Sequence, residues 1–290
     1  MKKETIYISE HLWTTTFGKP VVTQLKDKLE PTGYKIIEIK KHNNNDWSRD
    51  FMPVKDGNGK LVKFMYEPIY LTESEKWKKT IPDVNQILLD IGIADYSESE
   101  LKLDGGAIEV LGDQAIVSDR VLRENIHKFT ISETVSIIKK ALALKKLIFI
   151  PEYPDDFTGH VDGIVRFIDK NTVLVNAEST EYADEKNHYK RKMHKNWYYA
   201  FHSVLASAGL KCETIPFAFY KDNAGKEQFG LYINFLKLAE LIVMPEYKMP
   251  EDNKAAEILE KLYKRPVIRI DSRELAKNNG IINCITWEKK

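Results

Sequence analysis

The stretch DGNGKLVKFMYEPIYL (56–71) decides the class of fold, because it joins a tight turn directly to a strand-like run. Asp-Gly and Asn-Gly pairs are the residues that tight hairpin turns favour. The run that follows is rich in β-branched and aromatic side chains, which pack well on a pleated sheet. The stretch therefore predicts strands that come in pairs around a turn.

Similar β-rich runs recur along the whole chain: ETIYIS (4–9), YKIIEI (34–39), AIEVLGDQAIVS (107–118), KLIFIP (146–151), TVLVN (172–176), LYINFL (231–236), ELIVMP (240–245), PVIRI (266–270) and IINCIT (281–286). Helical patterns lie between them at 131–144 and at 252–263, the second opened by Asp252 in a capping position. The chain is therefore predicted to be α/β. Its strands are too frequent for a simple doubly wound sheet. Without a linker or a visible repeat, we expect a single domain over residues 1–290.

The charge composition argues against nucleic acid and anionic membranes as main partners. Lys plus Arg number 44 and Asp plus Glu number 43. This balance gives no electrostatic reason to expect nucleic acid or an anionic membrane as partner. The first residues carry charges where a signal peptide is apolar, and no window approaches about 18 apolar residues. We expect a cytoplasmic protein, whose two cysteines, Cys212 and Cys284, are then free thiols.

Cys284 lies in the apolar run near the chain end, where a cysteine is most often a small core residue. A catalytic thiol would need an acid–base partner. DDFTGHVDGIVRF (155–167) offers one. If His160 begins an extended segment, Asp162 points to the same face, about 6 to 7 Å away. The alternative is a hydrogen-bonded pair at the surface.

A first cluster of charges lies in NNNDWSRDFMP (43–53). We expect Trp47, Arg49 and Asp50 in a loop, where a large aromatic and charges are unusual unless they pack on something specific. The alternative is a buried Arg49 paired with Asp46 or Asp50.

A second cluster is LDGGAIEV (103–110), where Asp104 precedes paired glycines at the start of a strand. Paired glycines allow a tight turn or a close backbone approach, and either could be purely architectural. The basic segment 184–197, with His188 and His194, is predicted to be a solvated helix face without chemistry.

These groups share a chemical logic. A thiol, an imidazole and two carboxylates suit a substrate that is cationic, planar and electrophilic at carbon, and a guanidinium meets these conditions. Carboxylates bind its N–H donors in bidentate fashion. The thiolate attacks the central carbon, while the imidazole protonates departing ammonia and then deprotonates water.

Five motifs, in order along the chain, resemble the agmatine deiminase and bacterial peptidyl-arginine deiminase family of guanidine-modifying enzymes: DWSRDFMP (46–53), LDGGAIEV (103–110), TGHVDGIVRF (158–167), YINFLKLAELIVMPEY (232–247) and NNGIINCIT (278–286). The resemblance covers about residues 43 to 286. It implies a five-bladed pseudo-symmetric α/β propeller of the pentein type. It also implies hydrolysis of a guanidino group to a ureido group through a covalent thiouronium. We expect no cofactor, and no metal either, because no His, Cys or carboxylate set stands at ligand spacing in the sequence.

The resemblance assigns roles residue by residue: nucleophile Cys284, general acid and base His160, guanidinium clamps Asp50 and Asp162, and a histidine-orienting carboxylate Asp104. We expect Trp47 and Arg166, which lie in the same motifs, to be further substrate contacts. Two positions depart from the family pattern. Asp104 is commonly Glu, one methylene longer, and Asn283 stands where glycines and a histidine usually precede the cysteine.

Several alternatives stay open. Agmatine is the leading substrate, with peptidyl or free arginine as the runner-up. An amidinotransferase is a weaker variant of the same chemistry, and a propeller that binds guanidino ligands or a protein without turnover is an alternative of another class. A homo-oligomer is compatible with the sequence, which gives no rule for the oligomeric state.

Overall fold

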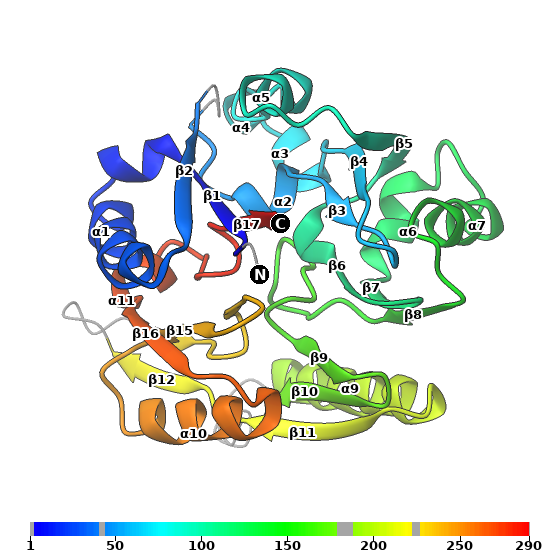
Figure 1. The fold of residues 1–290 in the computed structure, drawn as a ribbon. Coiled ribbons are helices and arrows are strands. Elements are labelled where there is room, and N and C mark those ends of the chain that lie inside the picture. Colours follow the sequence, from blue (N-terminus) through cyan, green and yellow to red (C-terminus); the bar gives the residue numbers. More distant parts are fainter. Residues whose placement is uncertain (1–2, 41–43, 179–187, 222–226, 290) are drawn as a thin grey trace. The chain divides into compact units, whose positions relative to one another are not determined.

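A computed structural model describes residues 3–40, 44–178, 188–221 and 227–289. Within these ranges, five sheets of three strands account for most of the β-structure (Figure 1). In the order in which their strands lie side by side, they are β17 (Trp287–Lys289), β1 (Thr5–Ser9) and β2 (Lys35–Ile39); β3 (Val54–Lys55), β4 (Leu61–Met65) and β5 (Tyr96–Lys102); β6 (Ile108–Leu111), β7 (Gln114–Ser118) and β8 (Lys146–Ile150); β11 (Lys211–Ile215), β10 (Thr172–Asn176) and β9 (Val165–Asp169); and β14 (Leu236–Lys237), β15 (Ile242–Glu246) and β16 (Val267–Asp271). A further pair joins β12 (Ala218–Lys221) to β13 (Glu227–Gly230).

The five sheets repeat one topology. An antiparallel pair comes first, and a helical connection then leads to a third strand beside the middle one. The third strand is parallel to the middle strand in β1/β2, β4/β5, β7/β8 and β15/β16. In the first sheet β17, from the chain end, supplies the antiparallel partner of β1. The repeat therefore lies in the order of elements, and it was not visible in the sequence.

The helices that connect or flank these strands are mostly short: α1 (Gly18–Leu29), α2 (Ser48–Phe51), α3 (Ile69–Thr72), α4 (Glu75–Lys78), α5 (Val84–Asp90), α6 (Arg120–Asn125), α7 (Ile131–Ala141), α9 (His188–Ser207), α10 (Glu251–Tyr263) and α11 (Arg273–Ala276), with the 3-10 helices η1 (Glu10–Thr14), η2 (Glu30–Thr32) and η3 (Gly105–Ala107). In the described ranges no helix is long and apolar enough to span a membrane.

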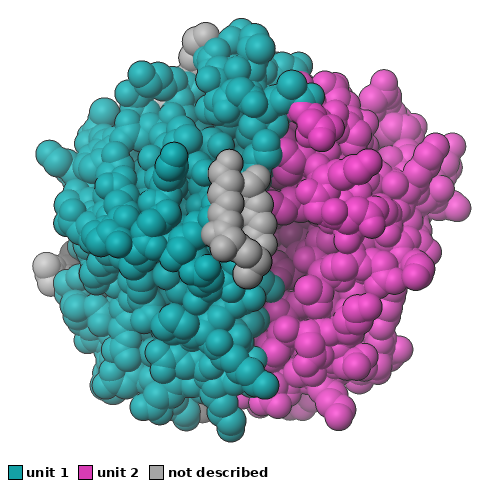
Figure 2. Space-filling model, viewed as in Figure 1, with its two compact units in different colours: residues 1–52, 75–94, 215–290 teal, residues 53–74, 95–214 magenta. Residues whose placement is uncertain are grey.

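The contacts of the chain divide it into two compact units, coloured separately in Figure 2. Unit 1 comprises residues 1–52, 75–94 and 215–290, and unit 2 comprises residues 53–74 and 95–214. Unit 1 has a core in which α1 and strands β1 and β15 pack together, and unit 2 has two cores around β7 and β10. The single domain expected from the sequence stays a prediction.

The turn that decided the class of fold is a hairpin turn. Asp56 Oδ1 accepts the backbone N–H groups of Asn58 and Lys60 at 2.8 Å each, and Gly59 has a φ of 84°. Strands β3 and β4 pair in antiparallel fashion on either side. The prediction of paired strands is confirmed.

Helix α7 also confirms its prediction, and its first residue is set by a capping box. Thr130 accepts the backbone N–H of Glu133, whose carboxylate in turn accepts the backbone N–H of Thr130.

Other local predictions were wrong. The LYINFL run forms a turn up to Phe235, the IINCIT run is also a turn, and the end of the run 60–71 enters α3. Asp252 is not the cap of α10, which begins at Glu251. Instead the buried Asp252 accepts the hydroxyl of Tyr232 at 2.7 Å and the backbone N–H of Tyr247 at 3.0 Å.

The solvated face predicted for the basic segment holds only in part, and residues 184–187 lie outside the described ranges. His188 is exposed at the start of α9, but His194 is buried. Its Nε2 lies 2.8 Å from Asp155 Oδ2, and Tyr153 packs against its ring. His194 therefore ties α9 to the loop that carries His160.

Candidate active site

In unit 1 the Trp-Ser-Arg-Asp motif is joined to the cysteine turn through Arg49. The motif forms the short helix α2 rather than the expected loop. The Arg49 backbone N–H donates to the Cys284 carbonyl at 3.0 Å, and its side chain reaches the Asn283 carbonyl at 3.4 Å. The guanidinium pairs with Glu288 at 2.6 Å, not with Asp46 or Asp50 as the structural alternative assumed. Arg49 therefore fixes Asp50 and Cys284 on one scaffold.

Cys284 lies in a turn because its isoleucine neighbours are anchored in the core. Ile281, Ile282 and Ile285 are buried in the main cluster of unit 1, while Cys284 is only half-buried. Hydrogen bonds from Ile285 N to Ile281 O (3.3 Å) and from Thr286 Oγ1 to Ile282 O (2.7 Å) close the turn. The thiol is thereby kept out of the apolar interior, which does not fit the interpretation of Cys284 as a core residue.

Asn234 supports this turn, and the sequence analysis gave it no role. Its side chain is 2% exposed. Its Oδ1 accepts the backbone N–H of Asn283 at 3.1 Å and lies 3.4 Å from the Cys284 sulfur. A single asparagine inside the apolar LYINFL run was the available signal, because a buried amide needs partners.

Trp47 packs against the same turn at Gly280. A Cβ added to Gly280 would lie 1.9 Å from Trp47 Cζ3, so a larger residue cannot fit without moving the indole. This contact explains the glycine in NNGIINC in terms of close packing.

We expect Gly280→Ala to lower the free energy of unfolding by about 1 to 3 kcal/mol, because overpacking displaces neighbouring groups. Chemical denaturation measures this. In a Trp47→Leu background, where the ring is absent, the same substitution should cost less than half as much. An equal cost in both backgrounds would contradict the packing explanation.

In unit 2, His160 and Asp104 lie together in the arrangement that the resemblance implies. His160 Nε2 is 3.2 Å from Asp104 Oδ2, and both side chains are buried. Tyr70, on α3, donates its hydroxyl to the same Asp104 oxygen at 2.7 Å. Asp104 is long enough to reach the imidazole despite the missing methylene. Sequence reasoning missed Tyr70, whose run was taken for a strand.

Asp162 is 2% exposed and follows His160 in a turn, not in the extended segment that we expected. Val165 N donates to Val161 O at 2.9 Å, which closes this turn before β9 begins. The Gly106 carbonyl accepts the N–H groups of Val161 (2.8 Å) and Asp162 (3.4 Å). The second of the paired glycines thus joins the motif of Asp104 to the motif of His160.

The loop before His160 is organised by Asp156 and Gly159. Asp156 accepts the backbone N–H groups of Thr158 at 2.8 Å and of His160 at 3.0 Å. Gly159 has a φ of 67°, and a Cβ there would lie 2.9 Å from Arg120 Cδ. Both the backbone angle and the space require glycine at this position.

Arg166 is buried in β9, where its Nε lies 3.1 Å from Glu109 Oε2. The carboxylate of Glu109 also accepts the backbone N–H of Phe167 at 3.4 Å. Glu109 comes from the end of the LDGGAIEV motif, so a buried ion pair joins β6 to β9. A contact between Arg166 and substrate stays a prediction.

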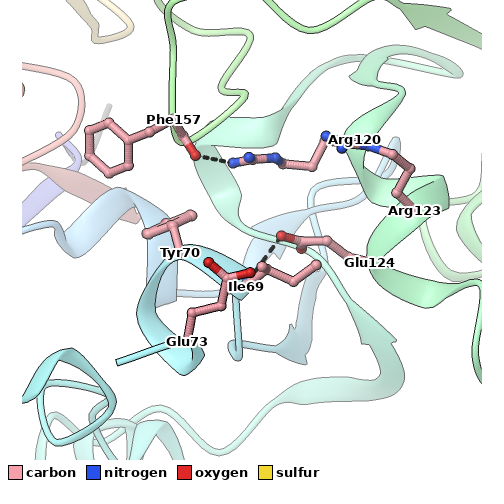
Figure 3. Close-up of a pocket in the computed structure, with 7 residues that line it drawn as sticks. All are labelled: Ile69, Tyr70, Glu73, Arg120, Arg123, Glu124 and Phe157. Atoms are coloured by element: carbon pink, nitrogen blue, oxygen red, sulfur yellow. Dashed lines mark hydrogen bonds between the residues drawn. The ribbon is translucent and has the colours of Figure 1, made fainter. Parts of the chain in front are cut away.

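Unit 2 contains a cavity of about 310 Å³, which Tyr70 helps to line (Figure 3). Its lining combines apolar, aromatic and charged side chains: Ile69, Tyr70, Glu73, Arg120, Arg123, Glu124 and Phe157. Burial raises the pKa of Glu124 to about 7, and the nearby charge of Asp104 adds to this effect. Glu124 therefore titrates close to neutral pH beside the His160–Asp104 pair.

The structure shows no set of metal ligands among the residues that it describes, counting groups of three or more His, Cys, Asp or Glu side chains. Cys212 and Cys284 are not joined in a disulfide. Asp155 pairs with His194, and Asp156 accepts backbone N–H groups in its own loop. The crowded acidic residues before His160 thus have structural partners.

Comparisons with known proteins show the family of this chain. Residues 8–289 match the sequence pattern of the Porphyromonas-type peptidyl-arginine deiminase family, almost the whole chain. This protein belongs to that family. The predicted class of enzyme, a hydrolase that acts on C–N bonds of linear amidines, is confirmed by the membership.

The individual relatives share less than a third of their residues with this chain. Agmatine deiminase of Pseudomonas syringae pv. syringae is 28% identical over 67% of this chain and 58% of its own length. The structure of C. jejuni agmatine deiminase superposes with a TM-score of 0.77 at 17% identity, covering 99% of this chain and 93% of that one. A cysteine-to-serine variant of the same enzyme with substrate bound gives a TM-score of 0.75, again at 17% identity and with the same coverage. The predicted pentein-type α/β fold, with its five small sheets, is confirmed.

Proposed function

We propose that this protein hydrolyses a guanidino group to a ureido group and releases ammonia, with Cys284 as the nucleophile. The observation that carries the proposal is the buried His160–Asp104 pair, with Nε2 and Oδ2 3.2 Å apart. A carboxylate at Nε2 favours the tautomer that carries its proton there, which leaves Nδ1 to exchange protons with a substrate. In a chain of this family, such a histidine is suited to act as general acid and base.

The reaction has two halves. The Cys284 thiolate attacks the central guanidinium carbon, and the new C–S bond forms as that carbon becomes tetrahedral. His160 gives a proton to one nitrogen, which leaves as ammonia, and a covalent thiouronium remains. Water then attacks the same carbon and gives a proton to His160. The C–S bond breaks as the new hydroxyl loses its remaining proton to solvent. The ureido product leaves, and the thiolate is restored.

Asp50 and Asp162 hold the cationic group in this proposal. Both are buried, at 6% and 2% exposed, and an ionised carboxylate forms strong, directional hydrogen bonds to guanidinium N–H groups. Holding the planar group still aligns its carbon with the sulfur, which lowers the barrier through orientation. Trp47 would contact the substrate from the position just before α2, and Arg166 from β9.

Agmatine is the leading substrate, because the relative from Pseudomonas syringae and the matching C. jejuni structures are agmatine deiminases. Peptidyl or free arginine is the runner-up, supported by the name of the family. Amidino transfer to an acceptor other than water is a weaker variant. A colorimetric assay of ureido product over agmatine, free arginine and arginine peptides tests the proposal. Ureido product from none of these compounds would favour a binding protein without turnover.

The proposed chemistry needs no metal. We expect exhaustive chelation to leave the rate of ureido formation within twofold of the untreated rate, because the thiol and imidazole supply the nucleophile and the proton transfers. Activity is measured before and after chelation, with added Mg²⁺, Ca²⁺ or Zn²⁺ in separate samples. A loss of activity that one of these ions restores would show that the acidic residues 155, 156 or 162 hold an ion.

A cytoplasmic location is part of the same proposal. A catalytic thiol must stay reduced, and a reducing compartment keeps thiols in this state. The balanced charge supports a small guanidino compound or an arginine side chain as the partner, rather than nucleic acid or a membrane.

A further inference from the structure

Tyr70 contacts the His160–Asp104 pair, although it lies outside all of the sequence motifs. It lies on α3, and its hydroxyl donates to Asp104 Oδ2 at 2.7 Å. His160 Nε2 approaches the same oxygen at 3.2 Å. Asp104 therefore has one carboxylate oxygen shared by two donors, and the two donors come from segments far apart in the chain.

The ring of Tyr70 is held in place by its neighbours. It makes edge contacts with the rings of His160 (centroids 6.2 Å apart) and Phe157 (5.6 Å). The Arg120 guanidinium lies over it, with Cζ 5.9 Å from the ring centroid. Figure 3 shows Tyr70, Phe157 and Arg120 around the same cavity. These contacts fix the ring, and so they fix the direction in which the hydroxyl points.

We propose that Tyr70 is a positioning residue for the reaction: its hydroxyl orients Asp104 Oδ2 toward His160 Nε2 and so keeps His160 Nδ1 available for proton transfer. This proposal rests on the proposed function for its catalytic consequence. A carboxylate that accepts one hydrogen bond from a fixed phenol cannot rotate freely about its last torsion. The imidazole that binds the same oxygen is then held in one tautomer and one orientation.

The hydrogen bond also moderates the charge of Asp104. A donated O–H stabilises the carboxylate and reduces the negative charge that His160 meets. Without the hydroxyl, Asp104 would stabilise the imidazolium more strongly, so His160 would hold its proton to a higher pH. A structural role of the aromatic ring alone predicts no such change, because phenylalanine keeps the ring.

Other charged groups near His160 must be separated from this effect. Glu124 has a pKa of about 7 through burial and the charge of Asp104, so it titrates in the same range as an imidazole. Arg120 and Glu73 also line the cavity. The test is therefore made in the wild type and in a Glu124→Gln background, where the amide oxygen can still accept the N–H of Ile69.

The first measurement follows the His160 imidazole by NMR in the protein without substrate, with its signal assigned by comparison with His160→Gln. We expect Tyr70→Phe to raise the His160 titration midpoint by about half to one pH unit in both backgrounds, the size of one hydrogen bond. Tyr153→Phe is the matched control. It removes a hydroxyl from the loop that carries His160, at a ring that contacts His194 and Trp197. It should leave the midpoint unchanged. An unchanged midpoint in Tyr70→Phe would overturn the proposal.

The second measurement is kinetic. On an active guanidino substrate, Tyr70→Phe should lower kcat about five- to tenfold and leave KM within twofold, because orientation of the acid and base is lost while the clamps remain. Equal kcat in the variant and the wild type would overturn the positioning role. If the wild type releases no ureido product, the proposed function fails, whereas the NMR titration still decides whether Tyr70 controls His160.

Discussion

Cys284→Ala is expected to abolish ureido formation, with a loss of at least about a thousandfold in kcat, because no other group can form the covalent intermediate. The fold should survive. The side chain is half-buried in a turn whose backbone hydrogen bonds do not involve the sulfur. The turn itself is anchored by the buried residues Ile281 and Ile285. Circular dichroism and thermal unfolding would check that the variant is folded.

Cys212→Ala is the matched control for this prediction. Cys212 is exposed on β11, and no motif includes it. Its removal should change kcat by less than twofold. Full activity in the Cys284 variant would rule out the covalent mechanism, and equal losses in both variants would indicate a role for thiols in stability rather than in chemistry.

The sequence predicted the α/β class because the hairpin signal at Asp56–Gly59 is local. The turn residues, and the β-branched and aromatic run that follows them, lie within one short stretch of the chain and can be recognised there. The cysteine turn is different. Its run of isoleucines has strong strand propensity, yet core contacts and the hydrogen bonds of Asn234 and Arg49 bend it into a turn. Such nonlocal contacts leave no periodicity in the sequence.

The same limit applies to the candidate site. His160 and Asp104 were found through a resemblance of motifs, and the structure brings them within 3.2 Å of each other. Tyr70 and Asn234 were not found, although each contacts a predicted site residue. Their partners lie about 30 to 50 positions away in the chain. The apolar run around Asn234 signals only that this amide needs a partner, and nothing in the sequence says which one. The motifs thus identify the reacting groups. The contacts of Tyr70 and Asn234 that support those groups are visible only in the folded structure.

Asp50→Asn and Asp162→Asn decide whether the substrate is a cation. Each substitution keeps the size of the side chain and removes its charge. A lost charge-assisted hydrogen bond to a guanidinium costs a few kcal/mol, which is roughly a hundredfold or more in kcat/KM. Misplacing the guanidinium should add a loss in kcat, since the approach of sulfur to carbon depends on orientation. The loss should therefore appear in the chemical step as well as in binding.

A generic thiol hydrolase would not show this dependence. Its electrophile is neutral, and the oxyanion that develops needs hydrogen-bond donors rather than carboxylates. The measurement is kcat, KM and binding of an active guanidino compound for each variant, with Asp169→Asn as a control at an exposed position in β9. The control should stay within twofold of wild type. If Asp50→Asn and Asp162→Asn also keep near wild-type rates, the carboxylates do not hold a cation, and the guanidino substrate must be abandoned even if Cys284 proves to be the nucleophile.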